Sequence, residues 1–206
     1  MSMMLEKIEK TVAPKLSGKQ LVLLFGVVSA FGVLLVQYFA KVNEGLAHYQ
    51  AAEFQIVAPD YEADSTNAKT VADFMLVDSQ NRNVKLSQFS SVDVLVVNIW
   101  SAGCPVCRQE IPSLTELDRR LSGEEGVALI TIAVAESFEE VASYFPRGTN
   151  LRILFDKEDK IAGGVFETEK YPETFILDKK RRIRARFDGP RNWHGDTFIN
   201  YVKSFL

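Results

Sequence analysis

Residues 98–112 read Asn-Ile-Trp-Ser-Ala-Gly-Cys-Pro-Val-Cys-Arg-Gln-Glu-Ile-Pro, and this stretch connects a predicted buried strand to a predicted helix. The apolar run Val92–Trp100 that leads into it is typical of a strand buried on both faces. After the turn, apolar residues recur at helical spacing. They are Ile111, Leu114, Leu117 and Leu121. A second apolar run, Val127–Ala135, predicts another buried strand, so that strand, helix and strand form a crossover with parallel strands.

Further elements are predicted on both sides of this crossover. Before it, Val71–Val77 predicts a short strand and Val84–Leu86 predicts its hairpin partner. After it, the expected helices are Phe138–Phe145, Lys160–Phe166 and Trp193–Leu206, and the expected strands are Leu151–Phe155, Thr174–Asp178 and Arg182–Asp188. The order strand, helix, strand and then strand, strand, helix is that of the thioredoxin fold. We therefore predict an α/β domain over residues 70–206, with a central mixed sheet flanked by helices and an extra N-terminal hairpin.

An uncharged apolar segment, Gln20–Ala40, precedes this domain. A helix over such a segment rises to roughly 30 Å, the thickness of a bilayer core, so residues 20–40 predict a single transmembrane anchor. Lysines precede the segment, whereas acidic residues dominate after Lys41. This asymmetry predicts that residues 1–19 are cytoplasmic and that the domain of residues 70–206 lies on the periplasmic side of the cytoplasmic membrane. Residues 41–69 are polar and acidic, which predicts a helical extension that becomes a flexible tether.

Three other interpretations of the apolar segment are less favoured. A cleaved signal peptide normally has an apolar region of about 7–15 residues, which is shorter than this one. A buried core helix usually keeps a polar stripe, which is missing here. A dimerising span is disfavoured because Gly26 and Gly32 do not have the spacing of a small-residue packing motif. The sequence favours an uncleaved anchor.

Composition narrows the class of protein. The chain has 206 residues and a formal net charge of -3, so nucleic acid is not expected as a partner. It has two cysteines, both in one Cys-x-x-Cys motif, which excludes a disulfide-stapled scaffold. Half of a zinc site would need further ligands, and His48 and His194 are far from the motif in sequence. No metal site and no bound cofactor are predicted.

The motif Cys104-Pro105-Val106-Cys107 carries the expected chemistry. Pro105 suits the first position of a helix, which makes Cys104 the predicted N-cap. There the unpaired backbone N–H groups and the helix dipole stabilise a thiolate, so the pKa of the Cys104 thiol is expected to fall. Cys107 lies one turn further on the same face and faces into the protein. We predict that Cys104 attacks a substrate disulfide and that Cys107 resolves the mixed disulfide, leaving a redox-active Cys104–Cys107 disulfide.

Two segments resemble the signatures of the membrane-anchored, TlpA/ResA-like thioredoxins. Residues 98–112 are similar to that family's active-site pattern N-F-W-x-x-W-C-x-x-C-x-x-E-x-P. Residues 171–178, Tyr-Pro-Glu-Thr-Phe-Ile-Leu-Asp, are similar to its x-P-x-T-F-L-I-D element. The resemblance covers about residues 70–206. It implies a thioredoxin fold and the activity of a thiol–disulfide oxidoreductase.

The resemblance also assigns roles to single residues. Pro172 matches the family's cis-proline beside the dithiol, where the backbone of Tyr171 is placed to pair with an extended substrate; a plain strand-start proline is the alternative. Glu110 matches a glutamate near the dithiol and is expected to accept or return the Cys107 proton, unless it is an ordinary acid of the first helical turn. Trp100 matches a tryptophan that packs under the turn. Gly103 departs from the pattern, which has Trp there, and this is expected to expose the turn and to alter partner choice.

These features predict an extracytoplasmic enzyme that reduces disulfides in exported proteins. The Pro-Val dipeptide contains no cation to stabilise the thiolate further, and Asn98 stands where cytosolic thioredoxins have a buried Asp; both favour a reductant over a strong oxidant. Expected partners are protein disulfide or dithiol clients and a membrane thiol carrier that supplies electrons. A narrower hypothesis is reduction of apocytochrome c during cytochrome c maturation. A non-catalytic alternative is a module that binds copper(I) or client thiols. A thiol peroxidase is disfavoured because residues 98–103 lack its Thr/Pro environment.

Overall fold

The computed structural model describes residues 17–64, 66–135, 137–145 and 148–206, and for residues 46–57 it describes the backbone alone. The predicted cytoplasmic segment 1–19 therefore lies almost entirely outside the described residues. The chain divides into two units, Met1–Gln50 and Ala51–Leu206. Each unit is described by itself.

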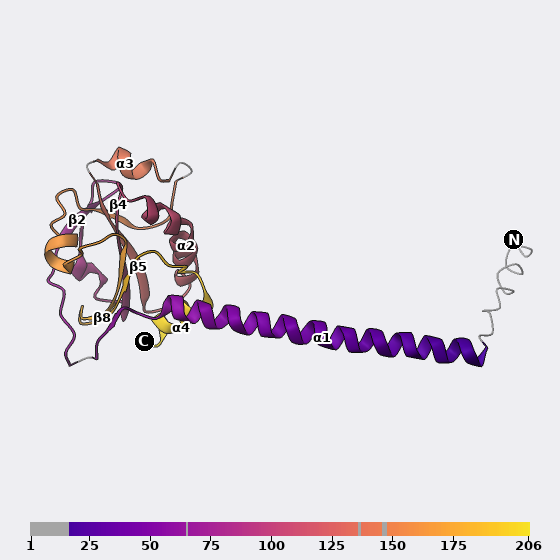
Figure 1. The fold of residues 1–206 in the computed structure, drawn as a ribbon. Coiled ribbons are helices and arrows are strands. Elements are labelled where there is room, and N and C mark those ends of the chain that lie inside the picture. Colours follow the sequence, from indigo (N-terminus) through magenta and orange to yellow (C-terminus); the bar gives the residue numbers. More distant parts are fainter. Residues whose placement is uncertain (1–16, 65, 136, 146–147) are drawn as a thin grey trace, which may run out of the picture. The chain divides into compact units, whose positions relative to one another are not determined.

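Helix α1, Gly18–Val57, dominates the first unit and is the long indigo-to-purple helix of Figure 1. Within it, Gly18–Gly45 is long and apolar enough to cross a membrane. The large apolar side chains of this stretch, from Leu21 to Val42, are exposed to the surroundings. An exposed apolar helix of this length is consistent with a membrane anchor or with a signal sequence.

The described part of the second unit contains one eight-stranded mixed sheet, in the order β1-β8-β7-β4-β5-β6-β2-β3. The strands are β1 Tyr61–Glu62, β2 Met75–Asp78, β3 Asn83–Lys85, β4 Val94–Ser101, β5 Val127–Val134, β6 Ile153–Phe155, β7 Glu173–Asp178 and β8 Ile183–Asp188. β4 pairs with β5 in parallel, as the crossover predicts, and β5 pairs with β6 in parallel. β7 pairs antiparallel with both β4 and β8. The predicted thioredoxin arrangement and its extra N-terminal hairpin, β2–β3, are thus present.

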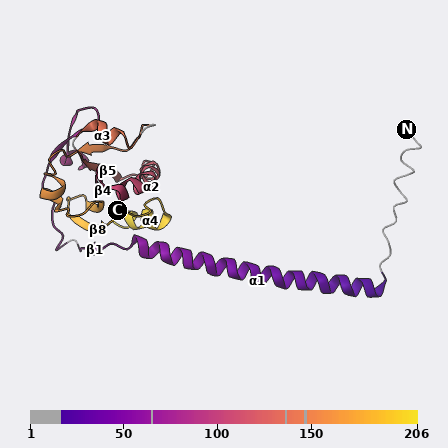
Figure 2. The ribbon, with the colours of Figure 1, turned by 45° about the horizontal axis from the view of Figure 1, so that its top comes forward.

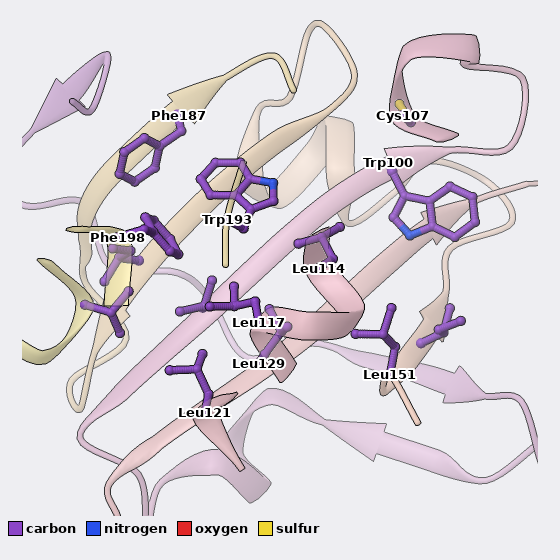
Figure 3. Close-up of a cluster of buried hydrophobic side chains, with 14 of the residues drawn as sticks. Trp100, Cys107, Leu114, Leu117, Leu121, Leu129, Leu151, Phe187, Trp193 and Phe198 are labelled. Carbon is purple, nitrogen blue, oxygen red and sulfur yellow. The ribbon is translucent and has the colours of Figure 1, made fainter. Parts of the chain in front are cut away.

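Both faces of the sheet are covered, which explains the continuous apolar runs of the sequence. The helical elements are η1 Leu86–Phe89, α2 Pro105–Leu121, α3 Phe138–Ala142, η2 Ala162–Phe166 and α4 Asp196–Lys203. Side chains of α2 and α4 pack with Val94, Val96 and Trp100 in one core, and η1 and η2 pack with Leu95 and Val97 in the other. Figure 2 shows the helices around the sheet from a second direction, and Figure 3 shows the α2 core. Successive residues of β4 therefore enter opposite cores.

Several predicted elements differ from the structure in their ends or their type; the expected helix Phe138–Phe145, for example, ends at Ala142. The first strand begins at Met75 rather than at Val71, whose backbone N–H instead bonds to the Arg181 carbonyl. The segment Lys160–Phe166 forms a single π turn, η2, instead of an ordinary helix. The last helix begins at Asp196 and not at Trp193, because the backbone of Gly195 is extended and caps it. Residues 189–195 form a loop, called the Arg191 loop below.

The predicted tether also ends differently. Residues 41–69 were expected to become flexible, but β1 lies inside that range and pairs with β8, with Tyr61 opposite Arg186. Ala63 donates its backbone N–H to the Arg184 carbonyl in the same register. β8 would otherwise present unpaired backbone groups at the edge of the sheet, and this segment covers them. The folded domain therefore begins before residue 70.

Candidate active site

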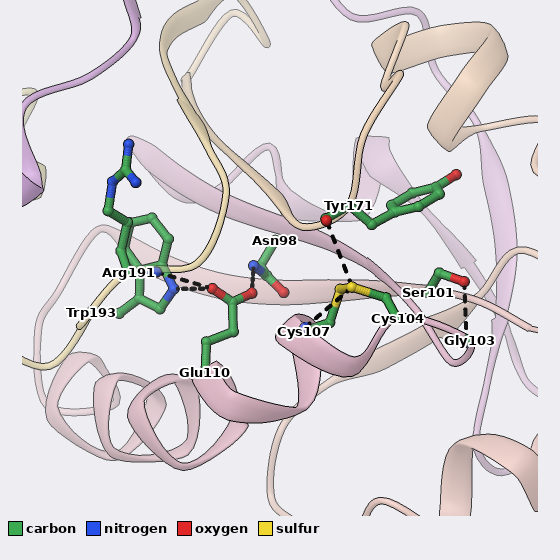
Figure 4. Close-up of a disulfide and its surroundings, with 9 residues drawn as sticks. All are labelled: Asn98, Ser101, Gly103, Cys104, Cys107, Glu110, Tyr171, Arg191 and Trp193. Atoms are coloured by element: carbon green, nitrogen blue, oxygen red, sulfur yellow. Dashed lines mark hydrogen bonds between the residues drawn. A yellow bond between two sulfur atoms is a disulfide. The ribbon is translucent and has the colours of Figure 1, made fainter.

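The Cys104–Cys107 pair lies where β4 gives way to α2, as the sequence predicts. Cys104 is the N-cap of α2, and its sulfur accepts the backbone N–H of Cys107 over 3.2 Å. Pro105 occupies the first helical position. The two cysteines form a disulfide with Cα atoms 5.4 Å apart, so the structure shows the oxidised state (Figure 4).

The two sulfurs differ in accessibility. Cys107 is completely buried, whereas Cys104 is partly exposed. After reduction, the free N–H groups and the dipole at the start of α2 favour a thiolate at Cys104. An accessible, stabilised thiolate beside a buried thiol is the arrangement that thiol–disulfide exchange requires, with Cys104 reacting first.

Tyr171 and Pro172 face this disulfide from the start of β7. The peptide bond between them is cis, as expected from the sequence. The carbonyl oxygen of Tyr171 lies 3.6 Å from the Cys104 sulfur (Figure 4). The Tyr171 hydroxyl donates to Asp159 over 2.7 Å, and burial together with that carboxylate raises the pKa of the phenol. The backbone before Pro172 thus lies against the reactive sulfur, and the side chain of Tyr171 is bonded elsewhere.

Glu110 lies on α2, one turn beyond Cys107, and its carboxyl group is inside the protein. The residue is only 2% exposed, unlike an ordinary first-turn acid. Oε1 accepts from the Asn98 amide over 2.9 Å, and Oε2 accepts from the Trp193 indole over 2.9 Å and from the Arg191 backbone over 3.4 Å. Burial raises the pKa of Glu110, and these donors oppose the rise in part.

Trp100 and Gly103 occupy contrasting positions beside the turn. Trp100 is buried in the same core as Cys107 (Figure 3), and its ring contacts Tyr144 with centroids 5.2 Å apart. Gly103 is exposed, and a Cβ atom there would meet only the Ser101 hydroxyl, at 4.0 Å. Glycine therefore leaves open space in front of the turn, in accordance with the expected exposure of the motif.

Four neighbours of the site were not predicted from the sequence. They are Thr174, which accepts a hydrogen bond from Asn98, and Asp159, Arg191 and Trp193. Thr174 belongs to the quoted family element, which was the one available signal. Trp193 falls at the start of the predicted last helix, and nothing in the sequence marks it as a partner of Glu110. No cluster of three or more His, Cys, Asp or Glu residues that could hold a metal occurs among the described residues.

Comparison with known proteins agrees with this geometry. A sequence profile of the AhpC/TSA family matches residues 67–186, and the chain belongs to that family. The thioredoxin-like protein YneN of Bacillus subtilis is 27% identical over 165 residues, which cover 79% of this chain and 84% of YneN. The thiol:disulfide interchange protein DsbE of Allochromatium vinosum is 32% identical over 127 residues, which cover 59% of this chain and 66% of that protein.

Solved structures show the same fold. The crystal structure of a DsbE-type thiol:disulfide interchange protein from Chlorobium tepidum superimposes with a TM-score of 0.59 at 16% identity, covering 67% of this chain and 96% of that one. A thioredoxin domain from Bacteroides vulgatus gives a TM-score of 0.57 at 18% identity, covering 69% and 99%. The fold, the relatives and the Cys104–Cys107 pair define a thiol–disulfide oxidoreductase of the DsbE/TlpA type, as the TlpA/ResA resemblance predicts.

Proposed function

We propose that this protein reduces disulfides in exported proteins at the periplasmic face of the cytoplasmic membrane, to which residues 20–40 anchor it. The proposal rests chiefly on one relationship, the position of the partly exposed Cys104 sulfur 3.6 Å from the Tyr171 carbonyl. A client segment that pairs with the Tyr171–Pro172 backbone brings its own disulfide to that sulfur. Client binding thus uses backbone groups, which suits an enzyme that accepts several proteins.

The reaction takes two exchange steps. The Cys104 thiolate attacks one sulfur of the client disulfide, and the other client sulfur leaves as a thiolate that takes a proton from water. Cys107 then loses its proton and attacks the Cys104 sulfur, which breaks the mixed disulfide. The second client sulfur leaves and is protonated. Two electrons pass to the client, and the enzyme finishes in the oxidised state with Cys104 and Cys107 joined.

Glu110 is the proposed carrier of the Cys107 proton. It follows Cys107 by one turn of α2, and burial moves its pKa upward, towards the range in which it can take a proton from a thiol. In the oxidised structure its oxygens bond to Asn98, Arg191 and Trp193. These donors hold the carboxyl group in place while the cysteine pair changes state.

Residues of the turn support this direction of electron flow. The dipeptide between the cysteines is Pro-Val, which has no cationic side chain to stabilise the Cys104 thiolate, and Val106 is 41% exposed. A less stabilised thiolate favours the disulfide form of the enzyme and makes its reduced form a better reductant. A membrane thiol carrier would regenerate the dithiol.

Measurement of the reduction potential together with insulin reduction tests this direction. We expect a potential more negative than about −200 mV, in the range of reducing thioredoxin-like proteins, and catalytic turnover with a thiol donor. A potential near that of a strong oxidant would reverse the proposed direction. Stoichiometric copper(I) binding without turnover would support the binding-module alternative.

Client capture tests the proposed order of attack. In Cys107→Ser the mixed disulfide on Cys104 cannot be resolved, so clients accumulate as covalent complexes that reductant releases. Cys104→Ser is the matched control and should trap none. Recovery of c-type apocytochromes among the trapped proteins would support the narrower role in cytochrome c maturation. Their consistent absence from the trapped proteins, in a host that makes c-type cytochromes, would exclude that role.

The topology has its own test. Protease added to intact spheroplasts should remove the domain of residues 70–206 and spare an N-terminal tag. Without protease, the chain should be found at its full length in the membrane fraction. A shortened chain in the soluble periplasmic fraction would identify the apolar segment as a cleaved signal.

A further inference from the structure

Asp60 joins the segment after α1 to the end of the sheet. Its backbone N–H donates to the Arg186 carbonyl over 2.8 Å. Its Oδ2 atom accepts two hydrogen bonds, from the Asp188 backbone over 2.7 Å and from the Arg191 guanidinium over 2.9 Å. The Arg191 side chain is 20% exposed and the Asp60 side chain 39%, so this ion pair is partly shielded from water on the Arg191 side.

The Arg191 loop, residues 189–195, begins at this anchor and runs to the active site. Gly189, at φ 80°, donates its N–H to the Pro172 carbonyl over 2.9 Å. Arg191 donates its backbone N–H to Glu110, and Trp193 donates its indole N–H to the same oxygen (Figure 4). One short loop thus contacts both the proposed client platform and the buried acid.

The two ends of the loop are fixed by different elements. Trp193 is held from α2, because its backbone N–H donates to the Ser113 hydroxyl over 2.6 Å. Arg191 is held from the opposite side by the Asp60 carboxylate. A change at Asp60 should therefore release Arg191 while the bond between Trp193 and Glu110 stays in place.

We propose that Asp60 is a positioning residue for the active-site acid: through Arg191 it sets the hydrogen bonding and the charge around Glu110. The inference rests on the proposed role of Glu110 as proton carrier. It also connects the segment next to the anchor helix with the reaction, because α1 ends at Val57, shortly before Asp60.

The direction of the effect follows from the groups that face Glu110. Asn98 from β4 and Trp193 from the loop are neutral donors, Cys107 precedes Glu110 on α2, and Arg191 supplies the positive charge that acts on the carboxyl. Both the backbone N–H and the guanidinium of Arg191 favour the ionised carboxylate. Release of Arg191 removes both contributions. The protonated form of Glu110 is then favoured more strongly, and the pKa of Glu110 rises.

The test uses the full chain in detergent and follows the reduction potential of the cysteine pair from pH 5 to 9. A group whose pKa depends on the redox state bends this curve, and Glu110→Gln should abolish the bend assigned to Glu110. In Asp60→Asn the bend should move to a higher pH by about half a unit, the effect of losing one modest hydrogen bond. Asp64→Asn is the matched control, since the Asp64 carboxylate bonds within its own turn to Thr66 and Asn67.

The outcomes separate this inference from the proposed function. If the bend persists in Glu110→Gln, the role of Glu110 as proton carrier fails. If it disappears there but stays at its original pH in Asp60→Asn, the role of Asp60 alone is overturned. An equal shift in Asp64→Asn would also overturn it. Arg191→Met provides a second variant in case Asp60→Asn folds poorly: it should give the same upward shift.

Discussion

Trp193 donates its indole N–H to Glu110 over 2.9 Å, although the two residues are 83 positions apart in the chain. The Trp193 ring also contacts Phe187 and Phe198, with centroids 5.5 and 4.8 Å away. The buried acid beside the cysteine pair is therefore held by an aromatic residue that belongs to the core between the sheet and α4. The same side chain therefore packs in this core and hydrogen-bonds to Glu110, the proposed proton carrier.

Trp193→Phe should lower stability and raise the pKa of Glu110. The loss of a buried hydrogen bond to a carboxyl group costs about 1–3 kcal/mol, and the smaller ring leaves unfilled space in addition. Urea unfolding of the oxidised chain measures the loss. Phe198→Leu is the control, because it disturbs the same aromatic contacts without removing a bond to Glu110. If both variants move the pH dependence of the reduction potential equally, the indole hydrogen bond is not responsible.

Glu110→Gln should change how stability depends on pH. Burial raises the folded-state pKa of Glu110 above 4.5. The contribution of Glu110 to the free energy of unfolding is therefore fully present below the unfolded pKa and is lost as pH rises through the folded pKa. Glutamine cannot ionise, so the variant escapes this loss. The free energy of unfolding of the variant minus that of the wild type should therefore increase from about pH 4.5 to pH 8. A difference that stays constant over this range would contradict a raised pKa.

Tyr171→Phe should separate the tyrosine hydroxyl from the tyrosine backbone. The hydroxyl bonds to Asp159, whereas the carbonyl faces Cys104. Loss of this partly exposed hydrogen bond should cost about 0.5–1.5 kcal/mol of stability, and insulin reduction should stay within about threefold of wild type. Asp159→Asn gives a matched change at the other end of the bond. A large loss of turnover in both variants would show that the hydroxyl contact itself positions the client platform.

Gly103→Trp introduces the residue that the family pattern has before the first cysteine. A Cβ atom at this position meets only Ser101, and the residue is exposed, so the change in stability should be within about 0.5 kcal/mol. Thermal unfolding checks this, and the set of clients trapped by Cys107→Ser reveals any change in partner choice. Gly126→Ala is the contrasting control: at φ +79°, with its Cβ 2.9 Å from Asp93, it should cost more than about 1 kcal/mol. Equal effects of the two substitutions would contradict this account of space at the turn.

Local patterns predicted the elements well where both faces of a strand are buried. β4 and β5 stand out in the sequence because a strand covered on both sides has no polar face. The Cys104 cap and the cis bond before Pro172 were also predicted, since short motifs define them. Prediction failed where tertiary contacts overrode local preference. Residues 60–63 gave no strand signal, yet they pair with β8 because its edge offers unpaired backbone groups.

The sequence by itself determined the reactive pair and its place at the start of a helix, because a capped turn needs only neighbouring residues. It also determined the apolar span within α1, which depends on length and composition. Only the tertiary structure decided what surrounds Glu110. Asn98, Arg191 and Trp193 come from a central strand and a distant loop, and Asp60 reaches that loop from the segment after α1. Such contacts depend on how separate elements pack around a buried charge, and no local pattern in the chain records them.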